Sequence, residues 1–151
     1  MKTYLTTVIF LLASFMTHAE STNQATAYVM VEAEIYDFET NKEIPPEDQI
    51  LAGEITQNPK LITEIGKDAT IEIGKQDDNG KFTDLFKLVT TFPKNSANYL
   101  LELHLIKGEH EKVLSVEGTL EKTLLITTSV AGIGKGVRVK TKLLKELPES
   151  E

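Results

Sequence analysis

Asn58–Gly74, which reads NPKLITEIGKDATIEIG, is the stretch that decides the fold class. It contains two short runs in which apolar or β-branched residues alternate with other residues, Leu61–Ile65 and Ala69–Ile73. Between the runs lies a Gly-Lys-Asp tripeptide that begins at Gly66 and favours a tight turn. Alternation bounded by glycine and proline is typical of half-buried strands. We therefore predict a β protein in which these two runs form a hairpin that turns near Gly66.

The same stretch resembles part of a known family, the bacterial secretins, which are outer-membrane channels of type II and type III secretion systems and of pili. The residues that carry the likeness to the start of the secretin C-terminal β-domain are Pro59, Leu61, Thr63, Gly66, Ala69, Ile71, Ile73 and Gly74. The run Tyr28–Phe38, YVMVEAEIYDF, is similar to a strand of the same domain that contains Val-Glu-Ala. The likeness extends from about Ala27 to Gly74 and implies a secretin-like β-domain in a small, stand-alone exported protein.

Met1–Ala19 has the features of a cleaved secretory signal peptide. Lys2 supplies the positive start, Val8–Met16 is mainly apolar, and Thr17–Ala19 places small residues where signal peptidase cuts. A transmembrane anchor is the alternative, but the apolar run is shorter than the ~20 residues that a membrane-spanning helix needs. We expect a mature protein that begins at Glu20 and is periplasmic.

The composition excludes several classes of partner and linkage. The chain has no cysteine, so disulfides and a lipid anchor on cysteine are both excluded. Its net charge is −7, and because Lys2 is the only charged residue before Glu20, cleavage makes the net charge −8. An acidic protein is repelled by nucleic-acid phosphates and by anionic lipid surfaces. We therefore expect no nucleic-acid partner, and no membrane span after signal cleavage.

The mature chain is long enough for one domain with a single core. We expect a flexible tail over 20–26, a single secretin-like β-domain over 27–146 and an acidic tail over 147–151. Besides the two runs of the hairpin, strands are predicted at Ala27–Phe38, Phe82–Phe92, Asn98–Lys107, Val113–Leu120, Thr123–Val130 and Gly136–Leu144. We expect Val113–Leu120 and Thr123–Val130 to pair with each other. Many short strands separated by turns are typical of an antiparallel β-sandwich or a partly open barrel.

One short helix is predicted within this β-domain. Pro46 is followed by two acidic residues, as at many helix starts, and Ile50, Leu51 and Ile55 would share one face. The helix would end before Asn58 and Pro59.

The alternation also predicts which side chains face the core. The inward sets are Ala27, Val29, Val31, Ala33 and Ile35; Tyr99, Leu101, Leu103 and Leu105; and Val137, Val139, Thr141 and Leu143. On the last strand, Arg138, Lys140 and Lys142 face outward. A row of outward cations is typical of an edge strand protected against aggregation.

Two groups of acidic residues are candidate sites. Glu32 and Glu34 lie on one strand face and could form an acid–base pair, but no partner group is evident nearby, which favours a solvated strand face. Lys75–Lys81, KQDDNGK, has oxygen-bearing side chains but lacks the spacing of an EF-hand calcium loop. A plain hairpin turn is the favoured interpretation.

The two histidines of the mature chain and one glycine-rich run are further candidates. His104 and His110 would need additional ligands to hold a metal ion, and the acids around them are ordinary surface composition. Ala131–Gly136 is rich in glycine, but its lysine is followed by Gly136 where a phosphate-binding loop needs serine or threonine. We interpret this run as a flexible turn. We therefore predict no catalytic residue, cofactor or metal ion.

The function predicted from these observations is that of a non-catalytic exported β-domain that acts as a binding or protein-interaction module. Its partner would be another envelope protein, bound through an exposed edge strand. The alternative is an accessory component of a secretion or pilus system that docks onto a secretin channel. Because the predicted outward faces carry charges, we expect no pore, and a soluble monomer or small oligomer.

Overall fold

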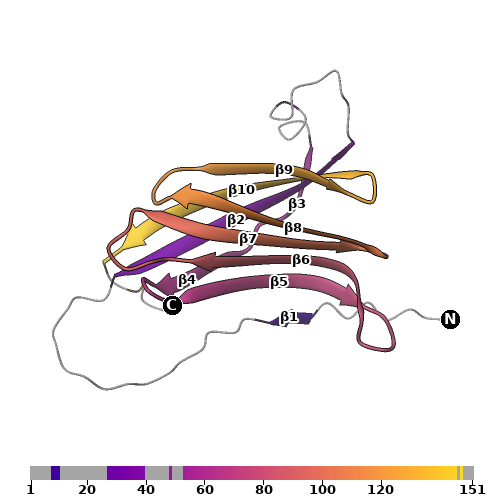
Figure 1. Ribbon diagram of the computed structural model, residues 1–151, viewed down its shortest axis with the longest axis horizontal. Coiled ribbons are helices and arrows are strands. Elements are labelled where there is room, and N and C mark those ends of the chain that lie inside the picture. The colour runs from indigo at the N-terminus through magenta and orange to yellow at the C-terminus, as the bar shows by residue number, and fades with distance from the viewer. Residues whose placement is uncertain (1–7, 11–26, 40–47, 49–52, 146, 148–151) are drawn as a thin grey trace.

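Two antiparallel sheets pack face to face in the computed structural model, which describes residues 8–10, 27–39, 48, 53–145 and 147 (Figure 1). The strands are β1 (Val8–Phe10), β2 (Tyr28–Glu39), β3 (Glu54–Gln57), β4 (Lys60–Glu64), β5 (Asp68–Gln76), β6 (Phe82–Thr91), β7 (Asn98–Lys107), β8 (His110–Thr119), β9 (Leu124–Val130) and β10 (Ile133–Leu144). The first sheet has the order β1-β5-β6-β7-β8, and the second has the order β3-β2-β10-β9, with β4 also paired to β2. The predicted antiparallel sandwich is confirmed.

The core between the sheets is built from the alternating side chains that the sequence predicts to face inward. Val29, Val31 and Ala33 on β2 are fully buried, and so are Leu101 and Leu103 on β7. The prediction is wrong at Ala27, which is exposed just before β2, and at the end of β10, where the Leu143 side chain is 40% exposed. β9 pairs with β10 only as far as Val139, so Leu143 has no β9 residue beside it.

The predicted turn at Gly66 is confirmed, but the predicted hairpin is wrong. β4 pairs with β2 and β5 pairs with β6, so the two runs belong to different sheets. Gly66 has a φ of 93°, which suits a residue without a side chain. The Ile65 amide donates to the Ala27 carbonyl at 3.0 Å, and the Gly66 amide donates to the Phe92 carbonyl at 2.8 Å. These bonds hold the chain in a corner that leads from one sheet to the other.

A second corner replaces the expected pairing of Val113–Leu120 with Thr123–Val130. β8 pairs with β7, and β9 pairs with β10. The connection turns at Glu121, whose φ is 63° and whose amide donates to the Thr141 hydroxyl at 3.0 Å. Alternation specifies which side of a strand faces the core, and strands in opposite sheets satisfy it as well as paired strands do. The pairing prediction was therefore wrong although the strands themselves are present.

The predicted edge position of the last strand is also corrected. From Ile133 to Val139, β10 lies between β2 and β9, and only the residues after Val139 lack a β9 neighbour. β10 also begins three residues earlier than predicted, at Ile133, because the turn itself is formed by Ala131 and Gly132, whose φ angles are 50° and 76°.

The expected short helix lies mostly outside the described residues. Asp48, the one described residue between 40 and 52, has helical backbone, but Ile55 belongs to β3 and pairs with Tyr36. No helix element is defined in the part of the chain that the structure describes. The predicted signal peptide also lies outside the described residues except at Val8–Phe10, and the tail over 20–26 lies wholly outside them.

Tyr99 offers a test of the packing. Its hydroxyl is buried and has no hydrogen-bond partner among the described residues, and its ring lies 5.1 Å from that of Phe92. Burial also raises the pKa of Tyr99, so the hydroxyl is neutral in the folded state. We expect Tyr99→Phe to leave stability unchanged or to raise it by up to about 1 kcal/mol, because an unsatisfied hydroxyl is removed. Urea denaturation measures the change in free energy of unfolding. A loss of about 1 kcal/mol or more would mean that the Tyr99 hydroxyl has a hydrogen-bond partner.

Candidate functional site

A pocket of about 210 Å³ lies at one end of the sandwich, between β3 and β5. Ile35, Ile73 and Phe86 form its apolar wall. Its remaining lining comes from five strands and consists of Asp37, Thr56, Gln57, Gly74, Lys75, Asp84 and Lys135. An apolar wall with a few polar groups at its mouth is typical of a binding pocket.

The edge of β5 beside this pocket is occupied by β1. The register pairs Val8 with Gly74, Ile9 with Ile73 and Phe10 with Glu72, in antiparallel orientation (Figure 1). Ile73 and Gly74 therefore belong both to the paired edge and to the pocket lining. A Cβ on Gly74 would lie 2.8 Å from the Phe82 ring and 2.7 Å from the Asp84 carbonyl, so this position requires glycine.

Two ion pairs lie at the pocket. The Lys135 Nζ donates to Asp37 Oδ1 at 2.5 Å, and the Lys135 side chain is only 14% exposed. On the other sheet, Lys107 Nζ donates to Asp84 Oδ2 at 2.5 Å. The first pair joins β2 to β10 and the second joins β6 to β7, so both hold neighbouring strands together at the pocket.

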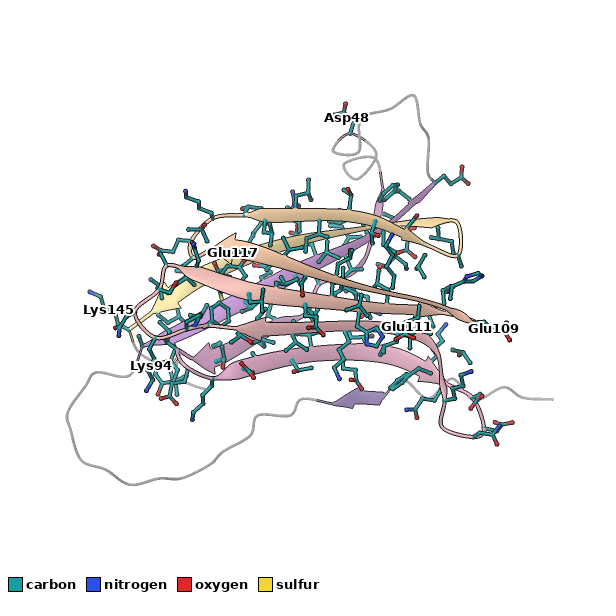
Figure 2. The ribbon with its side chains drawn as sticks, viewed as in Figure 1. Asp48, Lys94, Glu109, Glu111, Glu117 and Lys145 are labelled. Carbon is teal, nitrogen blue, oxygen red and sulfur yellow. The ribbon has the colours of Figure 1, made fainter. Side chains whose placement is uncertain are left out.

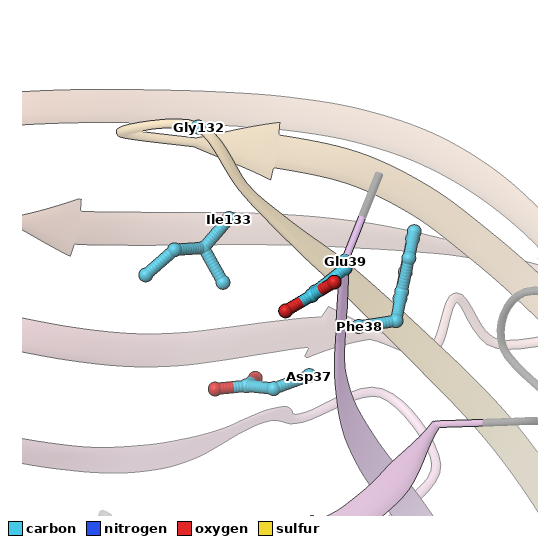
Figure 3. Close-up of a pocket in the computed structure, with 5 residues that line it drawn as sticks. All are labelled: Asp37, Phe38, Glu39, Gly132 and Ile133. Carbon is cyan, nitrogen blue, oxygen red and sulfur yellow. The ribbon is translucent and has the colours of Figure 1, made fainter. Parts of the chain in front are cut away.

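A shallower pocket of about 270 Å³ lies next to the first and shares Asp37 with it. Its lining residues come from the end of β2, from the β9–β10 turn and from the start of β10: Asp37, Phe38, Glu39, Gly132 and Ile133 (Figure 3). Gly132 and Ile133 belong to the glycine-rich run that was considered as a phosphate-binding loop. The lining contains two carboxylates and no cation, which does not suit a phosphate.

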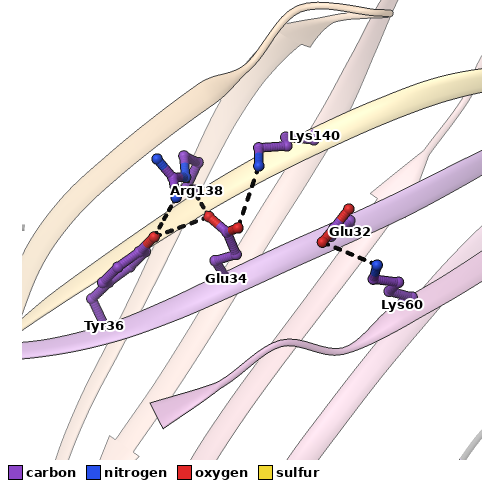
Figure 4. A network of polar contacts seen from close by, with 6 residues as sticks. All are labelled: Glu32, Glu34, Tyr36, Lys60, Arg138 and Lys140. Carbon is purple, nitrogen blue, oxygen red and sulfur yellow. Dashed lines mark hydrogen bonds and ion pairs between the residues drawn. The ribbon is translucent and has the colours of Figure 1, made fainter. Parts of the chain in front are cut away.

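On the outer face of the second sheet, a polar network surrounds Glu34 (Figure 4). The Glu34 carboxylate accepts hydrogen bonds from the Arg138 guanidinium, from the Tyr36 hydroxyl at 2.9 Å and from Lys140 Nζ at 3.3 Å. The neighbouring Glu32 pairs instead with Lys60, with an N–O distance of 3.2 Å. The expected solvated face is therefore wrong at Glu34, which is 8% exposed, and the two glutamates do not act on a common site.

The electrostatics of this network favour a structural role. Burial would raise the pKa of Glu34, but the hydrogen bonds from Arg138, Tyr36 and Lys140 outweigh it and lower the pKa below 4.5. Burial and the bond to Glu34 raise the pKa of Tyr36. Glu34 is thus a fixed carboxylate at neutral pH, and a general acid would need a raised pKa.

The remaining candidates have ordinary structural roles. His104 Nε2 contacts Glu111 Oε1 at 2.5 Å, whereas His110 lies opposite Lys107 in the β7–β8 register. Glu109 lies in the β7–β8 turn and Glu111 lies near the start of β8 (Figure 2). Across the described ranges, no group of three or more histidine, cysteine, aspartate and glutamate residues could hold a metal ion.

The predicted hairpin turn between β5 and β6 is confirmed. Asp77 Oδ1 accepts hydrogen bonds from the amides of Asn79 and Lys81, at 2.9 and 3.0 Å. The Gly80 amide donates to the Asp77 carbonyl at 3.0 Å. The Asp77 side chain is therefore used to close the turn.

Comparisons with protein-family models, with curated proteins and with solved structures find no match to this chain. The resemblance to secretins therefore rests on the sequence pattern alone. Leu61, Ala69 and Ile71 of that pattern are buried in the core. Gly66 lies in the corner between the two sheets, and Gly74 lies where the backbone comes close to Phe82 and Asp84. Within the described part of the chain, no helix has the length and apolar character needed to cross a membrane.

Sequence reasoning missed the pocket residues Asp37, Lys75, Asp84 and Lys135. They lie on four strands, and no local pattern brings them together. The Glu34 network did leave a signal, because Glu32 and Glu34 on one strand match Arg138 and Lys140 on another in spacing and in opposite charge.

Proposed function

We propose that this protein is a non-catalytic exported β-domain that binds an envelope protein by adding a strand of that partner to the edge of β5. In strand addition, an extended segment pairs its backbone with the edge of a sheet, and adjacent pockets select its side chains. Removal of residues 1–19 by signal cleavage would take Val8–Phe10 away and leave the β5 edge open.

The observation that carries this proposal is the pairing of β1 with Glu72–Gly74. It supports the proposal because an extended segment, joined to β2 only through residues 11–27, fits this edge in a regular antiparallel register. The opposite edge of the same sheet, β8, lies near β9 of the other sheet. The β5 edge near Gly74 instead lies beside the 210 Å³ pocket.

Docking onto a secretin channel is the second proposal for the partner. It rests on the resemblance of Pro59–Gly74, and strand addition would be the means of docking in that case too. Nothing in the geometry favours a secretin over another envelope protein. The β5 edge is common to both proposals.

The proposal is tested with the exported protein recovered from cells, whose N-terminus is read by mass spectrometry and is expected at Glu20. The probe is a fluorescent seven-residue peptide of alternating threonine and isoleucine, and fluorescence anisotropy measures its binding. Two control peptides carry N-methyl groups on alternate residues. In one peptide the methyl groups are on the odd-numbered residues, and in the other they are on the even-numbered residues. Alternate amides of a strand point to opposite edges, so only one set removes the donors that face β5.

We expect the unmodified peptide and one methylated peptide to bind, and the other methylated peptide to bind at least about tenfold more weakly, since several charge-neutral hydrogen bonds are lost. Equal binding of both methylated peptides would overturn strand addition. So would the absence of any binding to a protein that begins at Glu20.

A further inference from the structure

Residues of β5 contribute both to the pocket and to the edge that pairs with β1. Ala69 and Ile71 are buried in the core, and because side chains alternate along a strand, Ile73 and Lys75 lie on that same inward face. Both also line the 210 Å³ pocket. A residue paired directly with Ile73 or Lys75 directs its side chain to the face that its partner occupies.

The charges around the pocket are unequal. Lys135 is paired with Asp37, and Asp84 is paired with Lys107, so these four charges balance one another. Lys75 lies opposite Asp84 in the β5–β6 register, yet it makes no ion pair with any described residue. Among the described residues, Lys75 is therefore the cation of the pocket lining that has no ion pair.

The direction of a bound strand follows from the register of β1. The chain position increases from Val8 to Phe10 as it decreases from Gly74 to Glu72. If a bound strand keeps this register, one of its residues lies opposite Ile73 and another lies opposite Lys75. The residue opposite Lys75 comes two positions earlier in the bound strand. The two residues share the inward face and are separated by one residue that points away from the pocket.

We propose that the segment bound at the β5 edge has the sequence acidic–any–apolar, read from its N-terminus. The apolar side chain enters the pocket between Ile35, Ile73 and Phe86, and the carboxylate pairs with Lys75. This inference rests on the proposed function, and it adds the chemistry of the partner and the direction in which it binds.

The test uses the exported protein and three peptides of alternating threonine and isoleucine. One peptide carries glutamate two positions before the central isoleucine, the second carries lysine there, and the third has the glutamate placed two positions after it. The protein variants are Lys75→Glu and, as a matched control, Lys112→Glu, an exposed cation on β8 at the opposite edge of the sheet. Thermal melts establish that both variants fold.

We expect the first peptide to bind the unaltered protein about three- to fivefold more tightly than the other two, as a single exposed ion pair allows. Lys75→Glu should reverse the preference between glutamate and lysine, and Lys112→Glu should leave it unchanged. Equal binding of all three peptides, with the N-methyl effect intact, would overturn this inference and leave strand addition standing. Loss of the N-methyl effect would overturn strand addition itself. A dimer that the first peptide does not dissociate would mean that a second copy fills the edge.

Discussion

Ile71→Asp is expected to destabilise the protein by roughly 4 kcal/mol or more. Ile71 is 4% exposed and lies opposite Leu88 in the β5–β6 register, and Leu88 is itself 1% exposed. An aspartate at this position would place an unpaired carboxylate among apolar side chains. Because small domains have a total stability of only about 5–15 kcal/mol, urea denaturation should show a large shift or complete unfolding.

Thr70→Asp is the matched control for this prediction. Thr70 is the neighbouring residue on β5, and its side chain points to the outer face, opposite Val89. We expect a loss below about 1 kcal/mol, which reflects only the weaker strand preference of aspartate. If both variants unfolded at the same urea concentration, the assignment of the inward face of β5 would be wrong, and with it the position of Ile73 in the pocket.

Arg138→Ala is expected to cost about 2 kcal/mol at neutral pH. The substitution removes the guanidinium that donates to Glu34 and to the Tyr36 hydroxyl. It leaves a mostly buried carboxylate whose partners are the Tyr36 hydroxyl and Lys140. The Arg138 side chain is 31% exposed, so the cost should be lower than for a fully buried pair. The cation also lies over the Tyr36 ring, 5.6 Å from its centroid, and that contact is lost too.

The cost of Arg138→Ala should depend on pH. The folded-state pKa of Glu34 lies below 4.5, so its ionised form stabilises the fold above that pH, and this stability is lost as the pH falls through the folded-state pKa. In the variant, burial still raises the pKa of Glu34 while the contact that lowers it most is gone. The difference in free energy of unfolding between the two proteins should therefore shrink as the pH falls and Glu34 is protonated first in the variant and then in the unaltered protein. A difference that stays constant with pH would contradict this role of Glu34.

Lys140→Ala is the control on the same carboxylate. Lys140 Nζ lies 3.3 Å from Glu34 Oε1, and the lysine side chain is 44% exposed. Exposed ion pairs contribute about 0.2–1 kcal/mol, so we expect a loss within that range. A larger loss than for Arg138→Ala would mean that the lysine is the main partner of Glu34.

The strands and the core were predictable from sequence because alternation reports directly on burial. Asn98–Lys107 was predicted with the observed bounds, and its inward residues from Tyr99 to Leu105 are the most deeply buried of β7. Which strands pair with each other was not predictable, because the same alternation suits a strand in either sheet. The amide of Gly66 donates to the Phe92 carbonyl and the amide of Glu121 donates to the Thr141 hydroxyl where the chain passes into the opposite sheet. A local sequence pattern does not indicate such bonds to distant residues.

The candidate site was less accessible to sequence reasoning than the fold. Ile73 and Gly74 were singled out as the end of an alternating run, but their role at a pocket depends on β3 and on Lys135, which is more than fifty residues away. An exposed edge strand was expected as the binding surface. The sequence did not indicate which strand this is, and the strand that its outward cations marked as an edge lies inside the second sheet as far as Val139; the proposed edge is β5.

Hydrogen exchange over Glu72–Gly74 tests the central claim, that signal cleavage opens the β5 edge to a partner strand. Three samples are compared: the chain kept unprocessed by Ala19→Arg, the exported protein, and the exported protein with the glutamate-containing peptide. We predict slow exchange in the first, faster exchange in the second and slow exchange again in the third, with β8 unchanged throughout. Equal exchange of Glu72–Gly74 in all three samples would contradict the claim.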